Sequence, residues 1–591
     1  MVINMKRVLS LFFALTFVLC AAFATPLADL SVSAETTKNF TVYGLYTSDG
    51  DCSLLNMNGS WLLIDMGRKE NAGEVVAHLK RFGVKKLDFY LSHYHPDHYG
   101  DYAKLAENFE IGKVYLPDPA VISTDYKPSA RICKIIKKTL VENDEERVIY
   151  LKKGSAFQYG NVKAEVLGPV GNYHYTGSDN TEESEDNGDI GEYVNNCSLT
   201  TRFYCGSFSF ITCGDIEKKE EKALVAEYGS RLKSSLLKLS HHGLATSSSE
   251  QFIKAVAPDY AYALNSAYTT LIPRTDGTGK IRRCFTSRNN VSKYGLPYMV
   301  GDEKKNFVVK YNGSGVKLYR DSISDKTELN GFVELTGGDG VSFKTDKYYI
   351  KNGVTLTGLQ KIYGKLYNFS TGGCAIKGSM QNGKYNPFRK MPEGMCAFRQ
   401  DCSMYTGFQR VGKYTNYFSP SNGVRMVGNG NSWTLKKIGN SYYAINKNGV
   451  IYNKYCNYSG WLGFGNKRRF FDKNTGRMKT GWLNHKGKRY YLDPKTGYRA
   501  VGLKKIGKNT YYFVEKNKAA YMYKGGSKKF GKKYRYFDKK TGKMKKGWAK
   551  IGSYKYYFDK KTGYRTTGKK KINGKNYRFT SWGSLITITV D

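Results

Sequence analysis

The chain is poor in proline and lacks closely spaced cysteine pairs. Only 13 of its 591 residues are proline, whereas 63 are glycine and 49 are tyrosine. This composition favours many short strands and turns over long helices. Because 591 residues are too many for one hydrophobic core, we expect two or more domains.

None of the eleven cysteines belongs to a CxxC pair, which argues against a cysteine-rich zinc knuckle. Cysteines spread this widely do not specify a disulfide framework either. Export of the protein would permit disulfides, and buried free thiols are the alternative.

Long apolar segments are absent beyond the amino terminus. There, an apolar run from Val8 to Ala24 follows two basic residues, and Val32-Ser33-Ala34 or Ala22-Phe23-Ala24 offers a cleavage site of small residues. A run of about 17 residues is at the short limit for a spanning helix. We therefore predict a signal peptide over residues 1–34 rather than a membrane anchor. The mature protein should be secreted and extracellular, without a transmembrane segment.

Acidic residues are scarce in the C-terminal quarter of the chain. From Ile451 to Asp591 there are 38 Lys+Arg against 6 Asp+Glu, a net charge of 38 − 6 = +32, out of +44 for the whole chain. A basic tail on a secreted protein predicts an anionic partner, such as teichoic acid, nucleic acid or an anionic membrane. A solvated basic surface without a partner is the alternative.

Two sequence patterns divide the chain. Residues 35–325 contain strand-length apolar runs, such as SWLLIDMG and FSFITCGDI, between helical patterns such as NAGEVVAHLKRFG. After these residues a repeat begins, which is degenerate over residues 326–455 and regular over residues 456–591. We therefore predict an α/β domain followed by an all-β repeat region.

The regular repeat has a period near 21 residues. Gly460, Gly481 and Gly502 are 21 residues apart, as are Gly547 and Gly568, and a unit carries a glycine turn, an aromatic pair and Thr-Gly. This pattern predicts one β-hairpin per unit. Since a single hairpin is unstable in water, the hairpins should stack into a solenoid.

Three of the eight histidines lie in HYHPDH, residues 93–98, directly after the strand-like LDFYLS. His93 and His95 are two residues apart, so an extended segment can direct both rings to one metal. Asp97 and His98 follow at a helix start and can serve a neighbouring metal. A helix-capping polar loop is the alternative, but this pattern after an apolar strand is rare.

HYHPDH resembles the signature of the metallo-β-lactamase superfamily, whose fold is an αβ/βα sandwich. Three more motifs resemble those of the family in the expected order: LLIDMG with Asp65, FSFITCGDI with Asp215, and LLKLSHHG with His241 and His242. Where many members have a lone histidine, this chain has NNCSL, residues 195–199. That feature resembles a branch that includes DNA-uptake channel domains and teichoic-acid phosphorylcholine esterases.

The resemblance implies two divalent metal ions bridged by Asp215. The implied ligands are His93, His95, Asp97, His98, Asp215 and His241. Asn195 or water would complete the first site, and Asp65 would support the ligands from behind. His242 would face the substrate, although the roles of His241 and His242 can be exchanged. Such ligands suit zinc, with manganese or iron as alternatives.

Two metals that share a hydroxide would provide a nucleophile near neutral pH. Asp97 would orient this hydroxide, and His242 would stabilise charge or protonate the leaving alcohol. Sites of this kind suit β-lactams, thioesters, lactones or phosphoesters, and a metal pair suits in-line attack at phosphorus.

The repeats resemble the choline-binding, cell-wall-binding repeat family. In that family aromatic cages hold trimethylammonium by cation–π attraction, worth about 0.5–2 kcal/mol per contact. The matching residues are Trp461, Trp482, Tyr490, Tyr491, Trp548, Tyr556 and Tyr557. Packing within the hairpin core is the alternative for most of these rings, and binding of an anionic wall polymer by lysines is a rival explanation.

Together the resemblances predict a cell-wall-associated phosphodiesterase or phosphorylcholine esterase, from a Gram-positive bacterium. Its substrate would be (lipo)teichoic acid or another anionic or choline-bearing surface polymer. The first alternative is a secreted nuclease whose basic repeats bind nucleic acid. The second is an adhesin with a structural metal, against which the open ligand set argues, because structural zinc is usually closed by four protein ligands.

Overall fold

The computed structural model describes residues 38–48, 50–122, 132–134, 145–173, 188–264, 285–322, 326–338, 343–516 and 519–589. The predicted signal peptide lies outside these residues. The chain forms two compact units, one of residues 1–360 and 368–376, the other of residues 361–367 and 377–591. Across the described ranges, no helix is long and apolar enough to cross a membrane.

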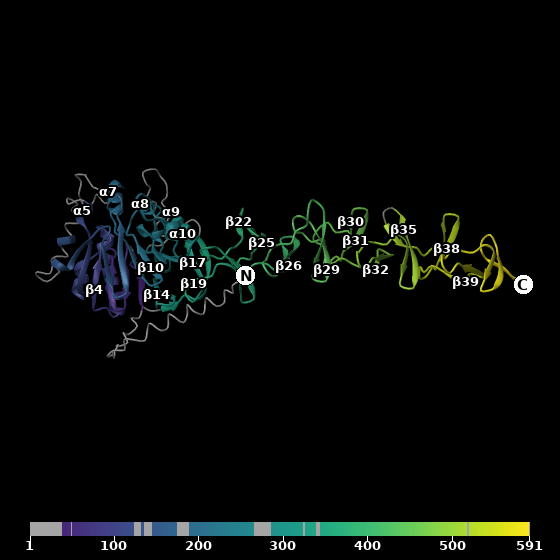
Figure 1. Ribbon diagram of the computed structural model, residues 1–591, viewed down its shortest axis with the longest axis horizontal. Helices are drawn as coiled ribbons and strands as arrows, with labels where there is room; N and C mark the ends of the chain where they lie inside the picture. Colours follow the sequence, from purple (N-terminus) through teal and green to yellow (C-terminus); the bar gives the residue numbers. More distant parts are fainter. Residues whose placement is uncertain are drawn as a thin grey trace, which may run out of the picture. The chain divides into compact units, whose positions relative to one another are not determined.

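The first unit contains a nine-stranded mixed sheet (Figure 1). Its strands are, in order, β16 (Lys326–Glu328), β15 (Val316–Asp321), β14 (Asn306–Tyr311), β1 (Phe40–Gly44), β2 (Ser53–Met57), β3 (Ser60–Ile64), β4 (Lys86–Tyr90), β5 (Glu110–Pro117) and β6 (Val148–Leu151). Strands β3 to β6 are parallel to one another. Both faces of this sheet are buried, because Leu55 and Leu62 point to one apolar cluster and Leu54 and Leu63 to another.

A seven-stranded sheet packs against the first. Its strands are, in order, β13 (Leu296–Met299), β12 (Tyr260–Ala263), β11 (Leu236–Lys238), β10 (Phe208–Thr212), β9 (Thr200–Cys205), β8 (Val162–Gly168) and β7 (Ala156–Tyr159). Strands β10 to β13 are parallel. The apolar layer between the sheets joins Tyr90 and Ile64 of the first to Phe203 and Phe210 of the second.

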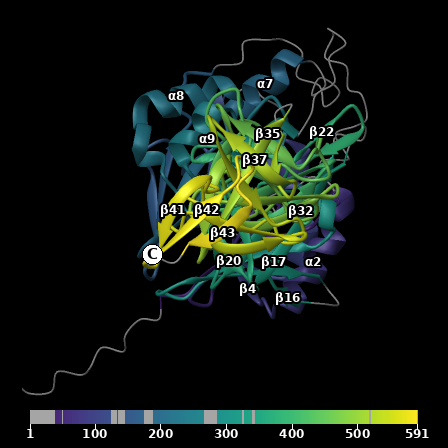
Figure 2. The same ribbon diagram turned by 90° about the vertical axis from the view of Figure 1, so that its right-hand side faces the viewer.

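Helices cover the outer faces of both sheets. Helices α2 (Ala72–Arg81) and α4 (Tyr102–Asn108) contribute Val75, Leu79 and Leu105 to the cluster outside the nine-stranded sheet. Helices α8 (Lys218–Tyr228) and α9 (Glu250–Val256) cover the seven-stranded sheet with Leu224 and Phe252. Figure 2 shows α8 and α9 on the opposite side of the unit from α2. The predicted αβ/βα sandwich is therefore confirmed.

The first unit extends further along the chain than the repeat pattern suggested. Strand β16 belongs to the nine-stranded sheet. Strands β17 (Gly331–Gly338) and β18 (Phe343–Lys351), followed by β19 (Val354–Thr355), place Val333, Leu335 and Tyr348 in the core between the sheets. Apolar and polar residues alternate in β17 and β18 as in a hairpin repeat, but the apolar face of these strands packs on the core of the first unit. The boundary predicted at residue 325 thus lies inside the first unit.

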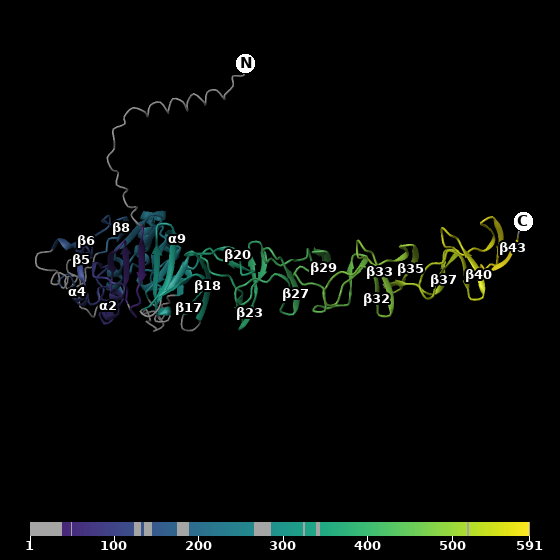
Figure 3. The same cartoon turned by 90° about the horizontal axis from the view of Figure 1, so that it is seen from below.

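The remaining strands form a series of antiparallel hairpins, which follow one another in chain order from teal to yellow (Figure 3). The pairs are β20 (Gly358–Ile362) with β21 (Lys365–Phe369), β22 (Ser379–Gln381) with β23 (Lys384–Asn386), β24 (Phe388–Met391) with β25 (Gly394–Ala397), β26 (Gly407–Val411) with β27 (Tyr414–Phe418), β28 (Thr434–Ile438) with β29 (Ser441–Ile445), β30 (Trp461–Phe464) with β31 (Lys467–Phe470), β32 (Gly481–His485) with β33 (Lys488–Leu492), β34 (Gly502–Ile506) with β35 (Asn509–Lys516) and β36 (Ala519–Met522), β37 (Gly526–Phe530) with β38 (Lys533–Phe537), β39 (Gly547–Ile551) with β40 (Tyr554–Phe558), and β41 (Gly568–Ile572) with β42 (Lys575–Phe579) and β43 (Leu585–Thr589). Gly481 and Gly502 open their strands at φ of 76° and 72°, a conformation that glycine adopts without steric cost.

Four of the regular hairpins are each closed by an Asp-x-x-Thr turn and joined just beyond it to an earlier hairpin. Oδ1 of Asp493 accepts hydrogen bonds from the N–H of Thr496 at 3.0 Å and from its hydroxyl at 3.1 Å. The N–H of Arg499, three residues beyond Thr496, donates to the carbonyl of Arg468 in β31 at 2.9 Å. The same turn recurs at Asp472, Asp538 and Asp559. The conserved spacing of the repeat therefore serves backbone connection between hairpins.

Candidate metal centre

The predicted histidines and aspartates meet where strands of both sheets end. His93 and His95 follow β4, and Asp215 follows β10. His241 and His242 follow β11 in a 3-10 turn, residues 241–243. In parallel sheets the carboxyl ends of neighbouring strands lie at one edge, where ligand sites commonly form. The fold thus gathers residues that are about 150 positions apart in sequence.

His98 lies at the centre of the cluster, on the short helix α3 (Pro96–Tyr99). Its Nε2 atom is 3.2 Å from Oδ2 of Asp215, and its Nδ1 atom is 2.9 Å from Oδ2 of Asp65. Asp65 also accepts hydrogen bonds from the N–H and the hydroxyl of Ser92, each at 2.7 Å. Both oxygens of Asp65 are therefore engaged in orienting its neighbours, as a supporting carboxylate would be.

Four overlapping groups of side chains have the spacing of a metal site, with all ligand atoms of a group within 4.8 Å of one another. The groups are His93, His98 and Asp215; Asp97, His98 and His242; Asp51, Asp215 and His242; and Asp51, Asp65 and His98. His95 lies beside the first group, since its Nδ1 atom is 3.1 Å from Nε2 of His93. The overlap at Asp215 is what a carboxylate shared between two ions would require.

The tandem histidines have different positions. Nε2 of His242 lies 3.1 Å from Oδ2 of Asp215 and 3.2 Å from Oδ2 of Asp97. Nε2 of His241 is 4.0 Å from Oδ2 of Asp215, and its Nδ1 atom is 2.8 Å from the hydroxyl of Thr246. The side chain of His241 is also the more exposed, 16% against 8%. This geometry favours His242 as the ligand, in the exchanged assignment of the pair.

Sequence reasoning did not identify two buried residues of the site. Oδ1 of Asp51 lies 2.9 Å from Nδ1 of His242, and Oδ2 forms a buried ion pair with Nζ of Lys238. Lys238 also donates to the carbonyl of Gly214 at 3.1 Å. The available signal was a lone lysine inside the apolar strand LLKL before the histidine pair, because lysine is almost never fully buried unless it is paired.

The pKa values of the aspartates and histidines in the cluster depend strongly on one another. Burial by itself would raise the pKa of Asp215, but His242 and His98 hold it well below its usual range. Burial would likewise lower the pKa of His98 and His242, yet the carboxylates, Asp215 foremost, raise both to about 10. The protons on His98 and His242 thus supply the positive charge that balances the buried carboxylates. A divalent cation would displace them, as ligand deprotonation accompanies metal binding.

The donor set fits a divalent ion. Within the described residues, Nε2 of His95, His98 and His242 are buried atoms without a hydrogen-bond partner. Burial also lowers the pKa of His93 and His95, so these rings are neutral and present lone pairs. Imidazole nitrogens and carboxylate oxygens in this number suit zinc.

The NNCSL segment supports the site from its edge. It lies where α7 (Gly188–Asn196) meets β9. The hydroxyl of Ser198 accepts a hydrogen bond from the N–H of Asp215 at 3.1 Å, and Oδ1 of Asn196 accepts one from the N–H of Glu217 at 2.9 Å. Asn195 donates to Glu217 at 3.3 Å, and its side chain opposes the lowering of the His95 pKa by burial. These residues position the loop that carries Asp215.

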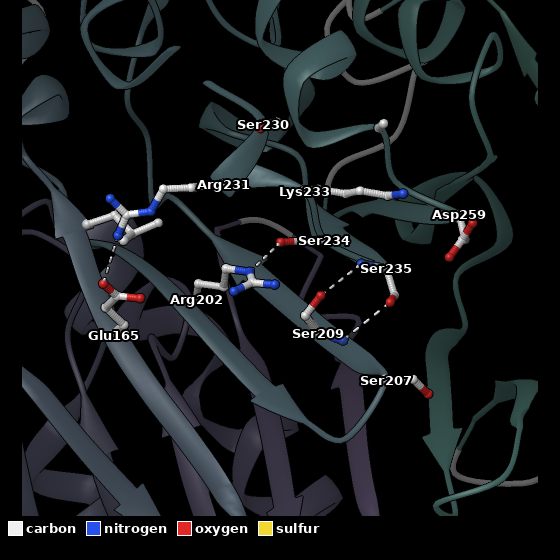
Figure 4. A pocket seen from close by; sticks show the side chains of 12 residues that line it. Glu165, Arg202, Ser207, Ser209, Ser230, Arg231, Lys233, Ser234, Ser235 and Asp259 are labelled. Carbon is white, nitrogen blue, oxygen red and sulfur yellow. Dashed lines mark hydrogen bonds and ion pairs between the residues drawn. The ribbon is translucent and has the colours of Figure 1, made fainter. Parts of the chain in front are cut away.

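A separate polar pocket of about 380 Å³ lies at the opposite ends of the same strands (Figure 4). Ser207 and Ser209 line it at the start of β10, and Ser234 and Ser235 before β11, with Arg202 donating to Ser234 at 3.3 Å. None of the predicted site residues lines this pocket. It is therefore distinct from the metal centre.

Residues 45–266 match the family model described as the metallo-beta-lactamase superfamily. The first unit carries a metallo-beta-lactamase domain. The chain is 31% identical over 204 residues to competence protein ComA of Neisseria gonorrhoeae, a match that covers 34% of this chain and 23% of that protein. It is 24% identical over 238 residues to ComE operon protein 3 of Bacillus subtilis (strain 168), covering 37% and 27%. The chain thus spans about a quarter of the length of these relatives.

Three solved structures each match between 41% and 44% of this chain. CbpJ from Streptococcus pneumoniae TIGR4 is 21% identical with a TM-score of 0.26, covering 43% of this chain and 94% of that one. Choline binding protein F from Streptococcus pneumoniae, solved in the presence of a peptidoglycan analogue, is 23% identical with a TM-score of 0.26, covering 44% and 94%. The modular autolysin LytC from Streptococcus pneumoniae is 19% identical with a TM-score of 0.23, covering 41% and 51%.

Proposed function

We propose that this protein is a metal-dependent phosphodiesterase that acts on cell-wall teichoic acid or a related surface polymer, with phosphorylcholine esters as its first candidate substrates. The observation that carries the proposal is the position of Asp215 between His98 and His242, at 3.2 Å and 3.1 Å. A carboxylate shared in this way suits a pair of ions. Two-ion sites stabilise both the attacking and the leaving oxygen of an in-line displacement at phosphorus.

The residues divide into two ligand sets around Asp215. The first set is His93, His95 and Asp215, and the second is Asp97, His98, His242 and Asp215. The ions, zinc in the first place, would supply a hydroxide nucleophile at neutral pH. In Asp97, which is 18% exposed, the carboxylate can accept a hydrogen bond from the attacking water and orient it.

His241 is proposed as the group that meets the substrate. Burial lowers its pKa to about 4, so the ring is neutral at physiological pH and can donate one N–H to a phosphoryl or leaving oxygen. Thr246 and Glu217 lie against Nδ1, at 2.8 Å and 3.5 Å, and fix the orientation of the ring. A positioned donor of this kind contributes more in the transition state than in the ground state.

A nuclease is the second candidate. It is supported by the sequence similarity to a protein named for competence and by the resemblance of NNCSL to the DNA-uptake branch. The net charge of +32 over residues 451–591 would serve a nucleic acid as well as a wall polymer.

The test is a comparison of three substrates with the full mature chain: p-nitrophenyl-phosphorylcholine, bis-p-nitrophenyl phosphate and linear DNA, each with and without a chelator. We expect cleavage of the phosphorylcholine ester that the chelator abolishes. Cleavage of DNA alone would establish the nuclease instead. Activity that survives both chelation and Asp215→Ala would rule out a metal mechanism.

A further inference from the structure

The tryptophans expected to form choline cages already carry cations from the chain itself. The ring of Trp482 is nearly perpendicular to those of Tyr491 and Tyr511, with centroids 5.1 Å and 4.9 Å apart. The guanidinium carbon of Arg489 lies 4.4 Å from the centroid of the Trp482 ring. The π face that would attract a trimethylammonium group is thus engaged by an arginine.

A second box has the same construction. Trp548 contacts Tyr557 and Tyr577 at centroid distances of 5.1 Å and 4.9 Å, and Nζ of Lys555 lies 4.9 Å from its ring centroid. In both hairpins the cation stands two residues before the tyrosine that pairs with tryptophan across the strands. Trp461 also carries a cation, but from another unit, because the guanidinium carbon of Arg499, beyond the turn at Asp493, lies 5.3 Å from its ring centroid. The internal cation is therefore a regular feature of these boxes.

Other lysines point into solvent at one position of the hairpins. The fourth residue of the five-residue first strand is exposed in eight hairpins, and seven of the eight residues are basic. They are Lys361, Arg410, Lys437, Asn484, Lys505, Lys529, Lys550 and Lys571. We call the six lysines of this set the lysine ladder. Within the described part of the chain, none of the six forms an ion pair with a carboxylate.

The acidic residues of the repeats do not neutralise this ladder. Asp472, Asp493, Asp538 and Asp559 each accept hydrogen bonds from the threonine three positions later. The ion pairs that three of them make are with lysines outside the ladder, namely Lys479, Lys504 and Lys545 at 3.1 Å, 3.6 Å and 3.2 Å. The ladder therefore presents an unneutralised positive charge in six of the eight described hairpins whose first strand has five residues.

We propose that the lysine ladder binds a flexible phosphodiester polymer without bases, of the polyol-phosphate type, and that choline is not needed for this binding. Charge complementarity favours a polyanion, and lysine, as a compact point charge, suits any phosphate without demanding a fixed geometry. Recognition of single-stranded nucleic acid instead relies on open aromatic platforms. Here the Trp482 and Trp548 rings pack edge-on against tyrosines and hold internal cations. The inference rests on the proposed function only in taking this polymer to be the substrate.

Binding can be measured apart from hydrolysis. The full chain carrying Asp215→Asn is titrated with choline-free poly(glycerol phosphate), and separately with single-stranded and duplex DNA, between about 50 mM and about 200 mM salt. We expect the polyol phosphate to bind more tightly than DNA and to be released by salt. Free choline should release no more than sodium chloride at the same ionic strength. Specific release by choline, or tighter binding of either DNA, would overturn the proposal.

The position of the charges is tested with matched triple variants. Lys505→Gln, Lys550→Gln and Lys571→Gln remove three ladder lysines, whereas Lys479→Gln, Lys504→Gln and Lys545→Gln remove three paired lysines and change the net charge equally. Each contacted phosphate contributes about 0.7 to the magnitude of the slope of log K against log salt concentration. Loss of three ladder lysines should therefore reduce the magnitude of this slope by about two. The control variant should reduce it by clearly less. Equal losses in the two variants would show that only net charge matters. If the polymer binds as expected but the wild-type chain hydrolyses no phosphodiester, the proposed function is overturned and the binding proposal stands.

Discussion

Oδ1 of Asp51 lies 2.9 Å from Nδ1 of His242, although Asp51 precedes β2 of one sheet and His242 follows β11 of the other. The contact is an ion pair, in which the carboxylate of Asp51 attracts one nitrogen of the His242 ring and restrains the direction of the other nitrogen. In His242 that other nitrogen faces Asp97 and Asp215. Asp51 thereby orients the ring of His242, the proposed metal ligand, and the first prediction concerns this contact.

Asp51→Ala should weaken metal binding, by about 10- to 100-fold as is typical for the loss of a supporting carboxylate. The measurement is metal content after dialysis against buffers of graded free zinc, with elemental analysis. Asp101→Asn is the control, since Asp101 caps helix α4 through its side chain and asparagine also caps. Unchanged zinc affinity in Asp51→Ala would contradict the assigned role.

Lys238→Met should destabilise the first unit, because it leaves Asp51 buried without its cation. Breaking one partner of a buried pair costs about 3–5 kcal/mol, which urea unfolding followed by circular dichroism can measure. The double variant Asp51→Asn with Lys238→Met should recover part of that loss. If the double variant is as unstable as the sum of the single ones, the two residues are not coupled.

Substitutions of the two adjacent histidines should have different effects on metal binding and on turnover. His242→Ala should lower the number of bound ions, while His241→Ala should keep both ions and lose about 10²- to 10⁴-fold in turnover, the range for a positioned proton-transfer group. Bound metal and hydrolysis of p-nitrophenyl-phosphorylcholine are measured on the same samples. The reverse pattern would restore His241 as the ligand, as the sequence first suggested.

Acidification should loosen the repeats through their aspartate turns. The Thr541 N–H foremost holds the pKa of Asp538 below its ordinary value, and Thr475, Thr496 and Thr562 act in the same way on Asp472, Asp493 and Asp559. A carboxyl with a depressed pKa in the folded state stabilises fully above its unfolded pKa, about 3.9, and loses this contribution as the pH falls below that value. The melting temperature should therefore fall below about pH 4.

The control for this prediction is Asp538→Asn combined with Asp559→Asn. Asparagine still accepts the threonine hydrogen bonds but does not titrate. The variant should begin with lower stability at neutral pH and lose less on acidification. A melting temperature that falls in parallel with that of the wild type would place the acid sensitivity elsewhere in the chain.

Much of the candidate site could be predicted because its histidines and aspartates are carried by local motifs. His93, Asp97 and His98 lie in one short stretch after a strand. Asp215 was predicted because it also follows the end of a strand-like segment. The choice between His241 and His242 could not be made from spacing, because both residues have positive φ, 50° and 52°, and only the turn decides which ring points inward.

The missed features have a shared physical origin. Asp51 and Lys238 are important because they form an ion pair that joins segments of the two sheets. No short sequence motif indicates such a pairing. The boundary of the first unit was misplaced for a related reason. Val333 and Tyr348 alternate like residues of a repeat hairpin, and only their burial in the core of the first unit distinguishes the two cases.

The Asp-x-x-Thr turn also has a consequence for how the array can evolve. A duplicated unit brings its own turn and its own backbone bond to an earlier hairpin, so it can be added without redesign of its neighbours. A copy of the unit that carries Lys529 or Lys550 also adds one outward lysine, while its aspartate stays engaged by the threonine of the turn. Each duplication would thus add one polymer-binding site and leave the candidate metal centre unchanged. Avidity grows with the number of sites that a long polymer engages at once.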